Sequence, residues 1–132
     1  MSGNDDVVWY LRLEEEDLGS VLVLTVHGRV FSQTVADFSA HLEGCDTRYF
    51  RAVIVDLSKV DYINSQGLRV LEGAATRARA SQRELVVCGL QPPVRTAFDL
   101  AGPAGLTVEA SRDAALRRVG GSKDPPLRNA GT

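Results

Sequence analysis

Residues 52–68 read AVIVDLSKVDYINSQGL and contain the clearest strand and helix signals of the chain. The stretch 52–57 is apolar except for Asp56, which is apolar enough for a central strand in a parallel sheet, covered on both faces. We expect residues 58–64 to form a loop and a helix to begin near Ser65. Its buried stripe would consist of Leu68, Leu71, Ala75 and Ala78. A buried strand that leads through a polar loop into an aliphatic helix is typical of an α/β protein.

The same alternation of strand and helix signals continues on both sides of this stretch. Strands are expected at 7–16, 21–27, 85–88 and 106–109, with a hairpin turn at 17–20. Further helices are expected from a Ser32 N-cap to Gly44, from Pro92 to Gly102, and from a Ser111 cap to Val119.

This order predicts a single α/β domain with a mixed sheet of four to five strands and about four helices. In such sheets, binding groups gather beyond the carboxyl ends of the parallel strands. In this chain, those ends lead into 28–32, 58–64 and 89–93. We therefore look for a functional site in these three segments.

The chain has 132 residues, which is the size of one ordinary domain. We assign 7–119 to that domain, 1–6 to a flexible N-terminus and 120–132 to a disordered tail. A formal net charge of −2 argues against direct nucleic-acid binding. We expect no membrane insertion, since no apolar run is long enough to span a bilayer. Two distant cysteines and the lack of an export signal predict a cytoplasmic protein.

The sequence lacks the residue patterns of common catalytic sites. It contains neither a Walker-type phosphate loop nor the G-x-G-x-x-G pattern of dinucleotide-binding folds. The only two histidines, His27 and His41, stand at a spacing that gives no support for a metal site. Around Ser65 only the second glycine of the hydrolase pattern G-x-S-x-G is present, and no histidine follows it. We therefore expect no catalytic residues, no metal, no cofactor and no enzymatic activity.

Residues 55–68 carry a motif that resembles the STAS domain, and within that family the anti-sigma factor antagonists of bacterial partner-switching systems. The family pattern is roughly V-D-L-x-x-V-x-x-[ILM]-D-S-[ST]-G-L. The matching residues are Val55, Asp56, Leu57, Val60, Ile63, Ser65, Gly67 and Leu68. The element order of 7–119 agrees with the family as well. The resemblance therefore implies a STAS-type α/β domain.

The resemblance also implies a function in protein binding. In the family, the serine that matches Ser65 is phosphorylated by an anti-sigma factor that is also an ATP-dependent serine kinase. The unphosphorylated antagonist binds that partner and frees the sigma factor, whereas phosphorylation breaks the complex. A metal-dependent serine phosphatase resets the switch. We expect the chain itself to be a monomer or a weak dimer.

The partner-binding surface is expected around the phosphorylation site. Its candidate residues are Phe31, Ser32, Asn64, Ser65, Gln66, Gly67 and Arg69. Ser65 would lie at a helix N-terminus, where unpaired N–H groups and the helix dipole stabilise a phosphate. Asn64 and Phe31 stand where the family often has Asp, and Gln66 stands where it usually has Ser or Thr. The loss of two acids would lower the repulsion of a phosphate.

Other interpretations of these residues remain open. Ser65 could be a simple helix N-cap, and Ser58 is a second candidate for phosphorylation. Phe31 could anchor a partner, or pack on the core at the start of a helix. A STAS domain can also be an adaptor subunit of a transport or sensory complex without a phosphorylation switch. Nucleotide binding is a third hypothesis, which the missing phosphate loop disfavours.

Overall fold

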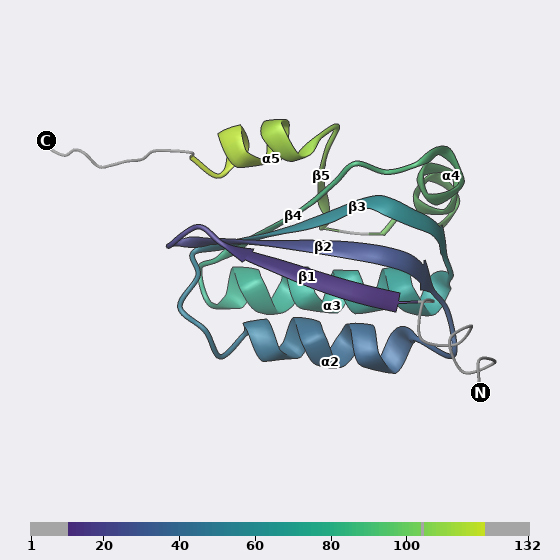
Figure 1. The fold of residues 1–132 in the computed structure, drawn as a ribbon, viewed down its shortest axis with the longest axis horizontal. Helices are drawn as coiled ribbons and strands as arrows, with labels where there is room; N and C mark the ends of the chain where they lie inside the picture. Colours follow the sequence, from purple (N-terminus) through teal and green to yellow (C-terminus); the bar gives the residue numbers. More distant parts are fainter. Residues whose placement is uncertain (1–10, 104, 121–132) are drawn as a thin grey trace, which may run out of the picture.

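Five strands form one mixed sheet in the order β1-β2-β3-β4-β5 (Figure 1). The strands of this computed structural model, which describes residues 11–103 and 105–120, are β1 (Leu11–Asp17), β2 (Val21–Val30), β3 (Ala52–Ile63), β4 (Glu84–Cys88) and β5 (Thr107–Glu109). The helices are α2 (Val35–Cys45), α3 (Ser65–Ala80), α4 (Pro92–Ala101) and α5 (Arg112–Arg118). β1 pairs antiparallel with β2, and all other neighbouring strands are parallel. The predicted α/β class with a mixed sheet is confirmed.

Helices cover both faces of this sheet. Figure 1 shows α2 and α3 side by side under one face and α5 over the other. On β3, Val53 and Val55 belong to the larger core with α2 and α3, whereas Ala52 and Ile54 belong to a smaller core with α5. Successive side chains of a strand point to opposite faces, so a strand covered twice must be apolar throughout. This requirement explains the apolar run at 52–55, which the buried Asp56 ends.

β3 does not end at Leu57, and the loop expected at 58–64 is wrong. The strand continues to Ile63, paired with β2, which itself continues to Val30. Two register shifts each place one additional residue in β3. At the first shift, the Asp56 carboxylate accepts a hydrogen bond of 2.9 Å from the Ser58 N–H. Apolar periodicity cannot predict such an extension, because most of its side chains face solvent and the bulges break the alternation.

The start of α2 also differs from the sequence expectation. Its N-cap position is Thr34, not Ser32, and the helix passes Gly44 to end at Cys45. The intervening residues 31–34 form a turn that is closed by hydrogen bonds from the N–H groups of Thr34 and Val35 to the Phe31 carbonyl. A serine is a favourable cap only where the backbone turns into a helix, and here that point comes two residues later.

The ends of the other elements agree with the sequence more closely. Ser111 caps α5, since its hydroxyl accepts a hydrogen bond of 3.1 Å from the Ala114 N–H. Gly102 ends α4 in the left-handed conformation at φ 58°. The hairpin turn lies at 18–20, as expected from the pattern at 17–20. The segments 1–6 and 121–132, for which we expected flexibility and disorder, lie outside the described residues.

Candidate functional site at the start of α3

A single residue, Asn64, separates the end of β3 from the start of α3. Its side-chain oxygen accepts a hydrogen bond of 3.0 Å from the Gly67 N–H, which makes Asn64 the N-cap. Its backbone N–H donates to the Val30 carbonyl at 3.0 Å, so the junction is also bonded to the end of β2. The interpretation of Ser65 as the cap is therefore wrong. The residue before it takes that role, because only Asn64 has the extended backbone that a cap requires.

Ser65 is the first residue of α3 and is exposed. Within the described parts of the chain, its hydroxyl has no hydrogen-bond partner. The first helical hydrogen bond runs from the Leu68 N–H to the Asn64 carbonyl at 3.1 Å, so the N–H groups of Ser65 and Gln66 precede the helical ladder. The hydroxyl is thus available for modification beside the positive end of the helix dipole.

Gly67 allows α3 to begin directly against the two strand ends. A Cβ atom at this position would lie 2.7 Å from Val30 Cγ1 and 2.7 Å from Ile63 Cγ1. Both atoms belong to buried side chains of the larger core. Any side chain at position 67 would therefore push the helix away from the sheet, and Ser65 would move with it.

Charged and aromatic side chains surround this junction at the ends of β2 and β3. Arg29 and Asp61 form an ion pair of 3.2 Å, with each side chain about half exposed. Tyr62 is 48% exposed, which is unusual for a large side chain in a sheet. Sequence reasoning did not select Tyr62 or Asp61, since both fell in the segment that we expected to be a loop.

The turn at 31–34 holds the neighbouring strand end in place. The buried hydroxyl of Thr34 accepts from the Phe31 N–H at 3.1 Å and donates to the Arg29 carbonyl at 2.7 Å. Phe31 is partly buried and Ser32 is exposed. No sequence motif indicates the role of Thr34, because its hydroxyl bonds only to backbone groups of the turn.

A groove of about 400 Å³ runs between α2 and α3 beside Ser65. It is lined by Val35, Ala36, Ser39, Gln66, Arg69 and Val70. The structure therefore brings two of the expected partner-binding residues, Gln66 and Arg69, to one concave surface. Asn64 is close to them, because its amide donates to Gln66 Oε1 at 3.3 Å. Gly67 is buried and supports this surface without forming part of it.

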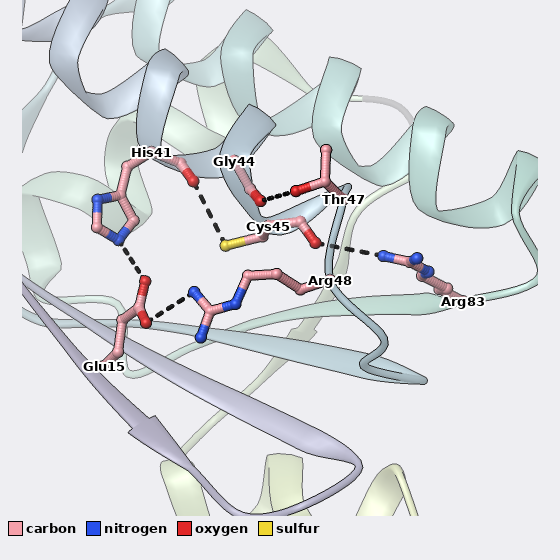
Figure 2. A network of polar contacts seen from close by, with 7 residues as sticks. All are labelled: Glu15, His41, Gly44, Cys45, Thr47, Arg48 and Arg83. Atoms are coloured by element: carbon pink, nitrogen blue, oxygen red, sulfur yellow. Dashed lines mark hydrogen bonds and ion pairs between the residues drawn. The ribbon is translucent and has the colours of Figure 1, made fainter.

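The two histidines both contact carboxylates of β1. His41 Nε2 lies 2.7 Å from Glu15 Oε2, and Figure 2 shows Glu15 between His41 and Arg48. His27 Nε2 lies 2.9 Å from Glu14 Oε1. Across residues 11–103 and 105–120, no group of three or more His, Cys, Asp and Glu side chains is placed to hold a metal ion.

The same network affects the acidity of its members. The hydrogen bond from Arg48 holds the pKa of Glu15 below its ordinary value. Burial raises the pKa of the Cys45 thiol, and it raises the pKa of Cys88 to about 12. Both cysteines are buried and free, so they remain thiols at neutral pH. No helix in the described part of the chain is long and apolar enough to cross a membrane.

The chain is similar to known proteins in both sequence and structure. The family model described as STAS domain matches residues 12–114. BtrV of Bordetella bronchiseptica, named as a candidate anti-sigma factor antagonist, is 35% identical over 106 residues, which cover 80% of this chain and 91% of BtrV.

Solved structures share the fold. An anti-sigma factor antagonist from Mycobacterium paratuberculosis superposes with a TM-score of 0.76 at 23% identity, covering 83% of this chain and 93% of that one. The anti-sigma factor antagonist SpoIIAA, solved in an unphosphorylated and a phosphorylated form, superposes in the former with a TM-score of 0.72 at 17% identity. That match covers 86% of this chain and 100% of SpoIIAA. The family model, the sequence relative and the five-stranded fold agree, and the chain therefore belongs to the STAS domain family, in its group of anti-sigma factor antagonists.

Proposed function

We propose that this chain acts as a phosphorylation-switched binding protein. With Ser65 unmodified, it sequesters a cognate anti-sigma factor that has serine kinase activity, and phosphorylation of Ser65 releases that partner. A metal-dependent serine phosphatase restores the binding form. The observation that carries the proposal is the exposed Ser65 hydroxyl at the N-terminus of α3, where Asn64 already provides the cap.

The local electrostatics support this role for Ser65. A phosphoserine carries a charge of about −1.5 to −2 at neutral pH. The helix dipole and the N–H groups of the first turn stabilise this charge on the free protein. Asn64 is neutral where a carboxylate would repel the phosphate. In a complex, the same phosphate must lose water and face the partner, which weakens binding without any change of fold.

The surface next to Ser65 supports a protein partner. The shallow groove between α2 and α3 is lined by apolar side chains, Val35, Ala36 and Val70, and by polar ones that include Gln66 and Arg69. Phe31 and Ser32 lie in the turn before α2, next to the end of β2 to which Asn64 is bonded. A surface that combines apolar and polar side chains is usual for a protein interface. The proposed protein is a cytoplasmic monomer or weak dimer without enzymatic activity.

Phosphorylation can be tested on the protein isolated from its own cells. Intact mass with mapping of the peptide around 52–69 should find a fraction that carries one phosphate, located on Ser65. A phosphate on Ser58 in place of Ser65 would move the switch into β3 and contradict the proposal. A protein that is unmodified under all growth conditions would contradict it as well.

Binding can be tested with three variants and an anti-sigma factor with serine kinase activity from the same cells. Ser65→Ala should bind as tightly as the unmodified protein, and Ser65→Asp should bind at least about tenfold more weakly. Ser58→Asp is the matched control, because it adds the same charge at an exposed serine of β3. Equal affinity of Ser65→Ala and Ser65→Asp would rule out the switch.

A further inference from the structure

A second cavity lies at the opposite end of α3 from Ser65. It has a volume of about 510 Å³ and is formed where α3 ends and where β3, β4 and β5 begin. A helix of 16 residues is about 24 Å long, so this cavity is separate from the site at Ser65. Its volume is within the range of sites for small molecules, which is about 300–1,000 Å³. Its lining is mainly polar and includes Gln82 and Thr107.

Three arginines from three different segments line this cavity. Arg51 precedes β3, Arg79 belongs to the last turn of α3, and Arg83 precedes β4. A cation in the last turn of a helix offsets the helix dipole, which accounts for Arg79 alone. It does not account for Arg51 or Arg83, so their convergence on one cavity needs another explanation.

None of the three forms an ion pair within residues 11–103 and 105–120. Their hydrogen-bond acceptors are neutral oxygens: Ser20 Oγ and the Val119 carbonyl for Arg51, the Gly105 carbonyl for Arg79, and the Cys45 carbonyl for Arg83. By contrast, six other arginines of the described chain are paired with carboxylates, namely Arg12, Arg29, Arg48, Arg77, Arg112 and Arg118.

The carboxylate in the cavity wall does not neutralise these charges. Glu84 is bonded to Arg118 of α5 at 3.3 Å. Three arginine side chains thus line one cavity, and none of them is paired with a carboxylate among the described residues. Such an arrangement repels itself in the empty protein and attracts anions.

The contacts to carbonyl oxygens position these arginines and leave donors free. Each guanidinium has five N–H donors, and the described contacts use one or two of them. Arg79 is held especially closely, because a Cβ at Gly105 would lie 2.7 Å from its Nη2. A guanidinium with a fixed orientation and free donors matches the geometry of a phosphate.

We propose that the cavity lined by Arg51, Arg79 and Arg83 binds a small phosphorylated molecule. The phosphate accepts hydrogen bonds from the free N–H donors of these arginines, and the rest of the molecule occupies the cavity beside Gln82 and Thr107. Because the site is far from Ser65, such a ligand can bind whether or not Ser65 is phosphorylated.

The test is a titration of the full chain, followed by NMR, with glucose 6-phosphate as the probe and glucose as its uncharged counterpart. Sodium chloride keeps the ionic strength constant. Glucose 6-phosphate should produce saturable shifts at the cavity residues, and glucose should not. Arg79→Gln and Arg83→Gln should each weaken binding about tenfold. Arg95→Gln, which removes an exposed charge on α4, should change it by less than about twofold.

Two further measurements separate a ligand site from a structural role. Arg79→Lys keeps the positive charge but lacks the paired N–H donors of the guanidinium group. It should therefore bind glucose 6-phosphate more tightly than Arg79→Gln and more weakly than the native protein. Inorganic phosphate and pyrophosphate should compete with the probe at the same residues. Shifts that do not saturate, or an equal loss of binding in Arg95→Gln and Arg79→Gln, would overturn the proposal.

Discussion

The helices α2 and α3 lie side by side on one face of the sheet, but they are attached to it in different ways (Figure 1). α3 begins one residue after β3, and Gly67 lets it touch the strand ends directly. α2 begins after a turn of four residues, and its contact with β1 includes the polar network of His41, Glu15 and Arg48 (Figure 2). The start of α3 is positioned by close packing of Gly67 on buried side chains, whereas the start of α2 is positioned by hydrogen bonds within the turn, to which the Thr34 hydroxyl contributes.

This difference fits the proposed roles of the two helices. Packing on the sheet holds the start of α3 in place. In the proposed switch, a phosphate on Ser65 therefore changes the charge of this surface and not its shape. At the start of α2, the turn at 31–34 is held by two backbone hydrogen bonds to the Phe31 carbonyl and by the hydroxyl of Thr34. This comparison can be tested with variants that destabilise the start of one of the two helices and leave the start of the other unchanged.

The largest effect is expected from Gly67→Ala. The added Cβ would lie 2.7 Å from two buried side chains, so α3 must move, and the free energy of unfolding should fall by about 2–3 kcal/mol. Urea denaturation measures this change. Gly73→Ala is the control within the same helix, since its Cβ would meet only Arg77 Nη1 at 3.5 Å. That variant should gain about 0.5–1 kcal/mol, and a similar loss in both would refute the role of close packing.

The next largest effect is expected at the start of α2 from Thr34→Val. The variant keeps the shape but leaves the Phe31 N–H and the Arg29 carbonyl without the hydroxyl that joins them. We expect a loss of about 1–2 kcal/mol in thermal or chemical unfolding. Thr34→Ser retains the hydroxyl and should lose less. If Thr34→Val is neutral, the turn does not depend on this hydroxyl.

A smaller effect is expected from Asn64→Ala at the start of α3. The loss of the cap should cost about 1 kcal/mol, because packing at Gly67 still holds the helix in place. Asn64→Asp keeps an acceptor and adds a negative charge at the positive end of the helix, so it should be at least as stable as the native protein at neutral pH. Equal destabilisation by both variants would show that the cap does not act through its oxygen.

The smallest effect is expected in the network that joins α2 to β1. Glu15→Gln should lower stability by about 0.5–1 kcal/mol at neutral pH. The pKa of Glu15 is lowered in the folded protein, so its stabilisation is present above about pH 4.5 and disappears as the pH falls through the folded value. Unfolding measured across this pH range should therefore show the two proteins converging in acid. A constant difference at all pH values would contradict the ion-pair origin.

Local sequence patterns were enough to predict the order of the elements and to suggest the candidate site. Three local patterns carried this prediction: the largely apolar run at 52–57, the aliphatic stripe of α3 and the Asn-Ser-Gln-Gly string. Each is formed by residues that are close together in the sequence. They predicted the α/β class, and the resemblance of the motif to the STAS family led from them to Ser65. The family itself was then shown by comparison.

The construction of the candidate site could not be predicted from these local patterns. The extension of β3 to Ile63, the cap at Asn64 in place of Ser65, and the contact of Gly67 with Val30 all depend on the neighbouring strand β2. The convergence of Arg51, Arg79 and Arg83 likewise joins segments up to 32 positions apart. Contacts between distant segments produce no periodic pattern of residues in the sequence. They form only because the fold places the two elements side by side.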